Sequence, residues 1–147
     1  MISAVAIFCE DIREEKSGQD TIVGTLPDYL AIENAPQISN SRSMLPKLAM
    51  YARIQFDVDD TPGDIAVALL DANGAVVAQT GFDPAVVKKS FSDTKANKMP
   101  LVNLITKVII GPFPIVRPGK IIAKLKIGDS ERVIGALNVM IGGTSAA

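Results

Sequence analysis

The chain of 147 residues contains no histidine, no tryptophan and a single cysteine. Without histidine, the Ser-His-Asp and Cys-His nucleophilic systems and every histidine-based zinc or iron site are excluded. Cys9 alone cannot form an intrachain disulfide or a thiolate metal cage, which favours an intracellular origin. The neighbouring acids Glu10 and Asp11 would raise the pKa of this thiol, so we predict a buried structural cysteine rather than a nucleophile.

Other signals are missing as well. Neither a Gly-x-Gly-x-x-Gly nor a P-loop pattern occurs, which excludes nucleotide binding by those routes. No apolar run approaches the roughly 20 residues needed to span a bilayer, so we expect no membrane insertion. Residues 1–9 are apolar but have no basic leader, and we interpret them as a strand rather than a secretory signal.

The sequence does carry a strong β pattern. From Leu48 to Val58 apolar residues alternate with mostly polar ones, as in a strand with one buried face. Asp71-Ala72-Asn73-Gly74 then has the residues of a tight hairpin turn. Similar segments bring the total to about eight or nine strands in a single domain over residues 1–141, with a flexible tail at 142–147. We therefore predict a mainly β fold, a two-sheet antiparallel β-sandwich with one short helix.

The helix is predicted over residues 85–96. Asp83 is a suitable N-cap and Pro84 suits the first helical position, while Val86, Val87 and Phe91 can form an apolar stripe. By contrast, prolines and a polar run indicate that residues 26–46 form a long connection with at most a short strand near residues 29–32.

Strand 65–70 is apolar on both faces and must be covered on both, by a second sheet on one face and by either the helix or another subunit on the other. The whole chain is 48% hydrophobic and 21% charged, with a mean hydropathy of +0.27. These values favour an oligomeric or lattice-bound subunit over a tightly packed monomer, which is the alternative.

Charge is divided along the chain. Residues 1–85 carry 13 acids and 5 bases, whereas residues 86–147 carry 3 acids and 10 bases. If the halves occupied different surfaces, the molecule would have charged ends suited to head-to-tail packing. The simpler interpretation is that early and late strands interleave, so that opposite charges are neighbours.

Two charged clusters are weak candidate sites. The first contains four carboxylates at a turn, which offer hard oxygen ligands for Ca²⁺ or a carboxylate pair for hydrolysis: Asp57, Asp59, Asp60 and Asp64. An ordinary exposed turn that contains Pro62 and Gly63 is the preferred explanation. The second is a basic stripe, extended by the helix lysines, that is a candidate for contact with phosphate or a protein: Arg117, Lys120, Lys124 and Lys126. Because no aromatic residues interleave with it, nucleic-acid binding is disfavoured relative to a solvated face.

The pattern Cys9-Glu10-Asp11-Ile12-Arg13-Glu14, then Gly18 and Thr21-Ile22-Val23-Gly24, resembles the opening of a family of small bacterial and bacteriophage proteins with no assigned reaction. In that family a strand ends in Cys-Asp-x-x-Arg, so Glu10 here stands in place of the usual Asp. Phe113-Pro114-Ile115 and Pro118-Gly119-Lys120 are similar to the bend before that family's last hairpin, and to immunoglobulin-like and C2-like sandwiches. The resemblance implies a β-sandwich in a phage or bacterial setting and provides no catalytic residue.

Together these observations predict a non-enzymatic assembly protein without cofactors, most concretely a bacteriophage virion component such as a capsid decoration or minor structural subunit. Its expected partners are other protein subunits, as a homo-oligomer or in a lattice, and its expected location is the virion or the cytoplasm of a bacterial host. The alternative is a small intracellular C2-like or immunoglobulin-like binding module that responds to Ca²⁺ or phosphate. An unrecognised hydrolase is a third possibility.

Overall fold

The computed structural model describes residues 1–27, 29–33, 43–115 and 117–142, which form eleven strands and one helix. The strands are β1 (Ser3–Glu14), β2 (Asp20–Thr25), β3 (Tyr29–Glu33), β4 (Ser43–Leu45), β5 (Leu48–Asp57), β6 (Ile65–Leu70), β7 (Val76–Gly81), β8 (Leu101–Ile110), β9 (Phe113–Ile115), β10 (Gly119–Ile127) and β11 (Ser130–Gly142). The helix is α1 (Pro84–Ala96). Most of the predicted tail, residues 143–147, and the middle of the predicted long connection, residues 34–42, lie outside the described residues.

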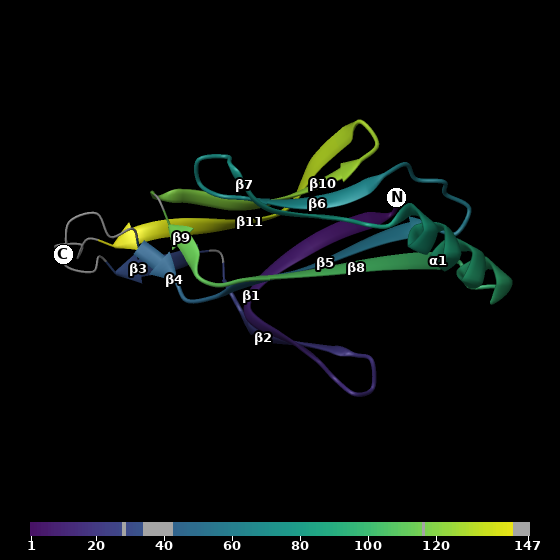
Figure 1. Cartoon of the computed structure of the whole chain (residues 1–147), viewed down its shortest axis with the longest axis horizontal. Helices are drawn as coiled ribbons and strands as arrows, with labels where there is room; N and C mark the ends of the chain where they lie inside the picture. Colours follow the sequence, from purple (N-terminus) through teal and green to yellow (C-terminus); the bar gives the residue numbers. More distant parts are fainter. Residues whose placement is uncertain (28, 34–42, 116, 143–147) are drawn as a thin grey trace.

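The strands form two main sheets that lie as layers over one another (Figure 1). The four-stranded sheet has the order β2-β1-β5-β8, and the five-stranded sheet has the order β3-β11-β10-β6-β7. The predicted two-sheet β-sandwich is therefore confirmed. Two details differ: β3 pairs with β11 in parallel, and the short strands β4 and β9 form a separate antiparallel pair. β3 is the short strand predicted near residues 29–32, and the pair of β4 and β9 raises the number of strands above the predicted eight or nine.

The core lies between the inner faces of the two sheets. In β5 every second side chain is buried, as the alternation predicts: Leu48, Met50, Ala52, Ile54 and Phe56. They pack with alternate residues of β6 and β10 on the facing sheet, namely Ile65, Val67 and Leu69 and Ile121, Ala123 and Leu125. This arrangement removes one face of each strand from water and leaves the opposite faces available for other contacts.

Helix α1 covers one end of the sandwich rather than a sheet face. It begins as predicted, because the Asp83 carboxylate accepts a hydrogen bond from the Ala85 amide at 2.8 Å and Pro84 occupies the first turn. Phe91 packs on Phe56 of β5 with ring centroids 5.7 Å apart. The predicted apolar stripe is wrong at Val86, which is 57% exposed.

The position of α1 bears on β6, whose two faces are both apolar. The helix packs mainly against β8, at the right-hand end of the molecule in Figure 1. The inward residues of β6 are buried, but Ala66, Ala68 and Leu70 on its outer face are only half-buried. The helix therefore does not cover the outer face of β6, although it was one of the two covers predicted for this strand.

The charged halves of the chain are interleaved. Early strands β1, β2 and β5 share a sheet with the late strand β8, and β6 and β7 share the other with β10 and β11. The Lys107 ammonium consequently meets the carboxylates of Glu14 and Asp20, and that of Lys95 meets Asp59. The simpler interpretation of the charge division is the one observed, and the molecule has no separate acidic and basic ends in its described part.

The two sheets approach closely where Gly135 of β11 faces Ala6 of β1. A Cβ atom added at Gly135 would lie 2.7 Å from the Ala6 carbonyl oxygen and 3.0 Å from the Ala6 Cβ. The pairing of β10 with β11 also shifts here, since Ala123 lies opposite Gly135 and Lys124 lies opposite Val133. The bulge turns the strand at the point where the sheets are nearest, and glycine makes that distance possible.

We expect Gly135→Ala to lower the free energy of unfolding by about 1–3 kcal/mol, because the added methyl group overlaps a backbone oxygen that belongs to the opposite sheet. Urea unfolding measures the difference. Gly63→Ala is the matched control: its added Cβ would lie 3.5 Å from Gly128 Cα, an ordinary contact. Equal stability of the two variants would contradict the steric explanation.

Candidate functional site

A cavity of about 380 Å³ lies between α1 and the loop of residues 60–64. Its apolar lining comes from Ile65 and Phe82 and from Val87 and Phe91 of the helix. Asp60, Asp64 and Lys88 supply the charged groups of the lining. This volume falls within the range of about 300–1,000 Å³ found for small-ligand sites, and the combination of an apolar lining with few polar groups is typical of such sites.

The predicted acidic cluster lies beside this cavity, and three of its four carboxylates, those of Asp57, Asp59 and Asp60, are already engaged. Asp60 accepts hydrogen bonds from the terminal amine of Met1 at 2.9 Å and from the Asp57 amide at 3.2 Å. The bond to the amine holds the pKa of the Asp60 carboxyl below its usual value. Asp57 accepts from the Asp59 amide at 3.0 Å, and Asp59 pairs with Lys95 at 2.9 Å.

These contacts are those of a folded turn. Asp64 joins the turn to the β10–β11 hairpin through its backbone carbonyl, which accepts from the Gly128 amide. Within the described ranges, no group of three or more His, Cys, Asp or Glu side chains is placed to hold a metal ion. Asp57, Asp59, Asp60 and Asp64 thus share one region, but their arrangement is that of hydrogen-bonded turn residues.

We expect millimolar Ca²⁺ to leave the melting temperature unchanged, because the carboxylates of Asp57, Asp59 and Asp60 serve the turn and α1. A ligand present at 100 times its Kd would add about 2.7 kcal/mol to the stability of the folded state, which a thermal melt detects readily. Mg²⁺ at equal concentration controls for ionic strength. A rise in melting temperature specific to Ca²⁺ would contradict this interpretation of the turn.

The predicted basic stripe lies on the outer face of the five-stranded sheet. Lys120, Lys124 and Lys126 alternate with buried residues of β10, as the period of two predicts. Lys124 pairs with Glu131 at 3.3 Å, and Lys126 lies opposite the same glutamate in the strand register. Arg117 donates two hydrogen bonds to the Ala72 carbonyl in the loop between β6 and β7.

An ion pair neutralises Lys124 of the stripe, and the stripe does not extend to the helix lysines. Lys89 pairs with Asp93 and Lys95 pairs with Asp59, and α1 packs mainly against β8 rather than β10. No aromatic side chains interleave with the cationic residues of the stripe, which disfavours the binding of single-stranded nucleic acid. The stripe can instead supply polar contacts within a larger protein-binding surface.

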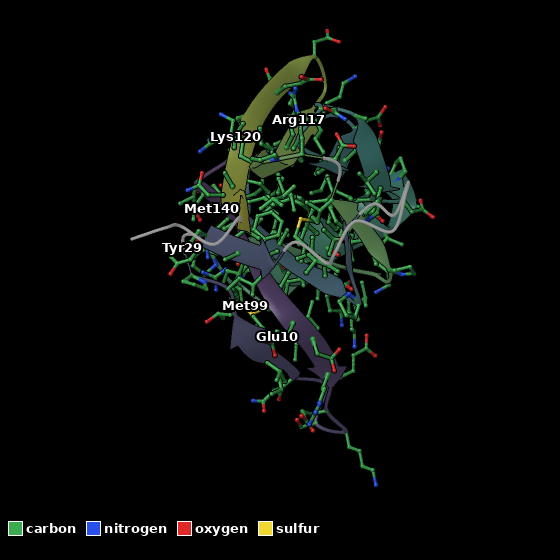
Figure 2. The ribbon with its side chains drawn as sticks, turned by 90° about the vertical axis from the view of Figure 1, so that its left-hand side faces the viewer. Glu10, Tyr29, Met99, Arg117, Lys120 and Met140 are labelled. Atoms are coloured by element: carbon green, nitrogen blue, oxygen red, sulfur yellow. The ribbon has the colours of Figure 1, made fainter. Side chains whose placement is uncertain are left out.

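Such a surface surrounds the lysines. The outer side of the five-stranded sheet carries apolar side chains that we call the apolar face: Tyr29, Ala66, Ala68, Leu70, Val76, Ile122, Val133 and Met140. Tyr29, Val76, Val133 and Met140 are each more than half exposed. Figure 2 shows Tyr29, Met140 and Lys120 along one side of the molecule. In the sequence, the apolar face was indicated only by the apolar residues on both faces of β6. That pattern does not show which strands lie beside β6 in the sheet.

A second small core forms where β1 leaves β5. The pairing of β1 with β5 ends where Cys9 lies opposite Ala49. Beyond that point β1 pairs with β2 alone, and their hairpin extends away from β5 and β8 (Figure 1). Cys9, Ile12 and Ala49 are buried together, and Ile22 of β2 packs against them. Burial, followed by the charge of Asp11, raises the pKa of the Cys9 thiol. The buried structural cysteine is confirmed.

Lys107 of β8 holds this hairpin to the sheet. Its ammonium lies 2.8 Å from the Asp20 carboxylate and 2.7 Å from that of Glu14, and the hydrogen bond with Asp20, followed by that with Glu14, raises the pKa of Lys107. The partners lie 87 and 93 residues away in the chain, so the sequence gives no signal of this contact.

Because the pKa of Lys107 is raised in the folded state, its contribution to stability is fully present below the unfolded pKa of about 10.5 and is lost as pH rises through the folded value. We expect Lys107→Gln to be less stable than the wild type at pH 7 and to converge with it at strongly alkaline pH, measured by urea unfolding. Lys89→Gln, which removes an exposed helical pair, is the control and should change little. If the difference in the free energy of unfolding between Lys107→Gln and the wild type stays constant across this pH range, the contribution of Lys107 is not electrostatic.

Neither the comparison with protein-family models nor that with curated proteins gives a match to this chain. The resemblance to small bacterial and bacteriophage proteins therefore stays a prediction from the residues quoted above. In the described part of the chain, no helix has the length and apolar character needed to cross a membrane.

Proposed function

We propose that this protein is a non-enzymatic assembly subunit that binds other protein subunits through the apolar face. The observation that carries the proposal is the exposure of Tyr29, Val76, Val133 and Met140 on one side of a single sheet. Exposed apolar side chains on one face, with polar residues among them, are typical of protein-binding sites. Lys120, Lys124 and Lys126 would orient a partner that carries complementary acids.

The chemistry of the chain supports a role without catalysis. The sequence has no histidine to act as a general base. The only thiol, that of Cys9, is buried and has a raised pKa, which disfavours the nucleophilic thiolate. The carboxylates of Asp57, Asp59 and Asp60 in the acidic turn are held by backbone amides, an amine and a lysine. These features support a structural role over a catalytic one.

More concretely, we propose a bacteriophage virion component such as a capsid decoration or minor structural subunit. The support for this finer statement is the resemblance of residues 9–24 and of the bend at residues 113–120 to bacterial and bacteriophage proteins. Mass spectrometry of purified particles from a strain that carries the gene tests it. The chain should be present in stoichiometric amounts, and its absence from the particles would overturn the virion assignment.

The cavity between α1 and the loop of residues 60–64 favours a second candidate, a small C2-like or immunoglobulin-like binding module. Its volume of about 380 Å³ and its apolar lining suit a small ligand or a single large side chain of a partner. Val87→Trp would fill this cavity without touching the apolar face. If assembly were unchanged in that variant but lost in variants of the apolar face, the first candidate would be preferred.

For the apolar face, we expect Val133→Lys combined with Met140→Lys to weaken association, because two charges would have to be desolvated in any contact there. Light scattering after size exclusion, and incorporation into particles, measure the effect. Val86→Lys is a matched control, since Val86 is 57% exposed on α1, away from this face. Wild-type protein that stays monomeric and is also missing from particles would overturn the proposed function.

A further inference from the structure

β8 is an edge strand with unusually little protection. It forms one border of the four-stranded sheet and pairs with β5 over ten consecutive residues without a break in register. On its other side, no strand in the described part of the chain pairs with it. An edge of this length presents a row of backbone donors and acceptors that can pair with another strand.

Apart from α1, which packs against β8, the usual devices that block such pairing are largely missing from the strand. The strand contains no proline and no bulge. Its one charge, Lys107, projects from the outer face and is held by Glu14 and Asp20. The edge strand β7, by comparison, has six residues and an irregular register. Leu101, Ile105 and Ile109 on the outer face of β8 are 38%, 42% and 50% exposed.

We propose that β8 pairs antiparallel with β8 of a second copy of this chain, about a two-fold axis at Ile105. The inference rests on the proposed assembly function and names one partner, the chain itself. The result would be one continuous sheet of eight strands, in the order β2-β1-β5-β8-β8-β5-β1-β2, formed from two four-stranded sheets. Homodimers with two-fold symmetry bring the same surface of each copy together in this way.

The sequence of β8 selects this register. Directly opposed residues share a face of the sheet, so the numbers of each pair must have an even sum. With the axis at Ile105, Leu101 lies opposite Ile109 and Asn103 lies opposite Lys107, while Ile105 meets its own copy. On the inner face, Val102 would lie opposite Val108.

Neighbouring registers are poorer. With the axis at Thr106, Lys107 would lie opposite Ile105, and with the axis at Leu104, Lys107 would lie opposite Leu101. With the axis at Lys107, two ammonium groups would oppose each other, which is destabilising. The axis at Ile105 pairs apolar with apolar and polar with polar residues along the outer face. It uses nine of the ten residues, 101 to 109, as does the axis at Thr106, whereas the axis at Leu104 uses seven.

A cysteine at the axis tests the register directly. In Ile105→Cys the two cysteines would face each other with Cα atoms about 4.5–5.5 Å apart, a distance that a disulfide spans. In Ile109→Cys they would be separated by eight residues, about 27 Å along the strands. Oxidation should therefore give a covalent dimer with Ile105→Cys and none with Ile109→Cys. Buried Cys9 does not interfere.

Mixed samples provide the second readout. Leu101→Cys and Ile109→Cys should crosslink when mixed, because these residues are opposed, and neither should crosslink alone. The uncrosslinked wild type should have twice the chain mass of 15.6 kDa by light scattering, and Ile105→Lys should return it to one chain mass. Since Ile105 is 42% exposed, that substitution leaves the core intact.

The outcomes separate this inference from the proposed function. If Ile105→Cys gives no covalent dimer, the pairing is wrong, even where Val133→Lys with Met140→Lys still abolishes assembly. If Ile105→Cys and Ile109→Cys crosslink equally, the register is wrong. If Ile105→Cys crosslinks selectively while the variants of the apolar face assemble normally, the pairing of β8 stands and the apolar face is not the assembly surface.

Discussion

The buried face of β5 is the constraint on which the rest of the structure depends. Leu48, Met50, Ala52, Ile54 and Phe56 are each at most 1% exposed and pack in the core with residues of the five-stranded sheet. Because side chains alternate along a strand, a slip by one residue would move all five to the outside. Their burial therefore sets the registers of β1 and β8 on either side of β5. It also decides which face of each sheet is left for partners.

Both proposed contact regions follow from that division. The apolar face lies on the outer side of the five-stranded sheet, and the edge of β8 belongs to the four-stranded sheet. The apolar face would bind a partner by burying side chains, whereas the edge of β8 would bind one through backbone hydrogen bonds. A subunit with two such regions can pair with itself through one and attach to a larger assembly through the other.

The sequence predicted what is local and periodic. The alternation in β5, the capped start of α1 at Asp83 and Pro84, and the common face of Lys120, Lys124 and Lys126 all follow from residues close in the chain. The sequence did not predict the pairings between residues that are distant in the chain. The parallel contact of β3 with β11 and the meeting of Lys107 with Asp20 depend on how distant strands are ordered. A pattern along the chain contains no information on that order.

The same distinction applies to the candidate sites. The run of aspartates at residues 57–64 could be found by composition, but whether its oxygens point together depends on backbone amides and on Lys95, far along the chain. The apolar face was visible only in part, through β6. Its other members come from β3, β7, β10 and β11, and the sheet order alone brings them together. Val86 projects away from the core because α1 caps an end of the sandwich.

The burial of Cys9 gives this protein an internal reporter of its own motion. The thiol has no exposed surface and donates a weak hydrogen bond to the Ala49 carbonyl, at the point where β1 separates from β5. A thiol reagent can therefore react only when that junction opens. The rate of modification in the native state measures the free energy of opening at this one place, separately from that of global unfolding.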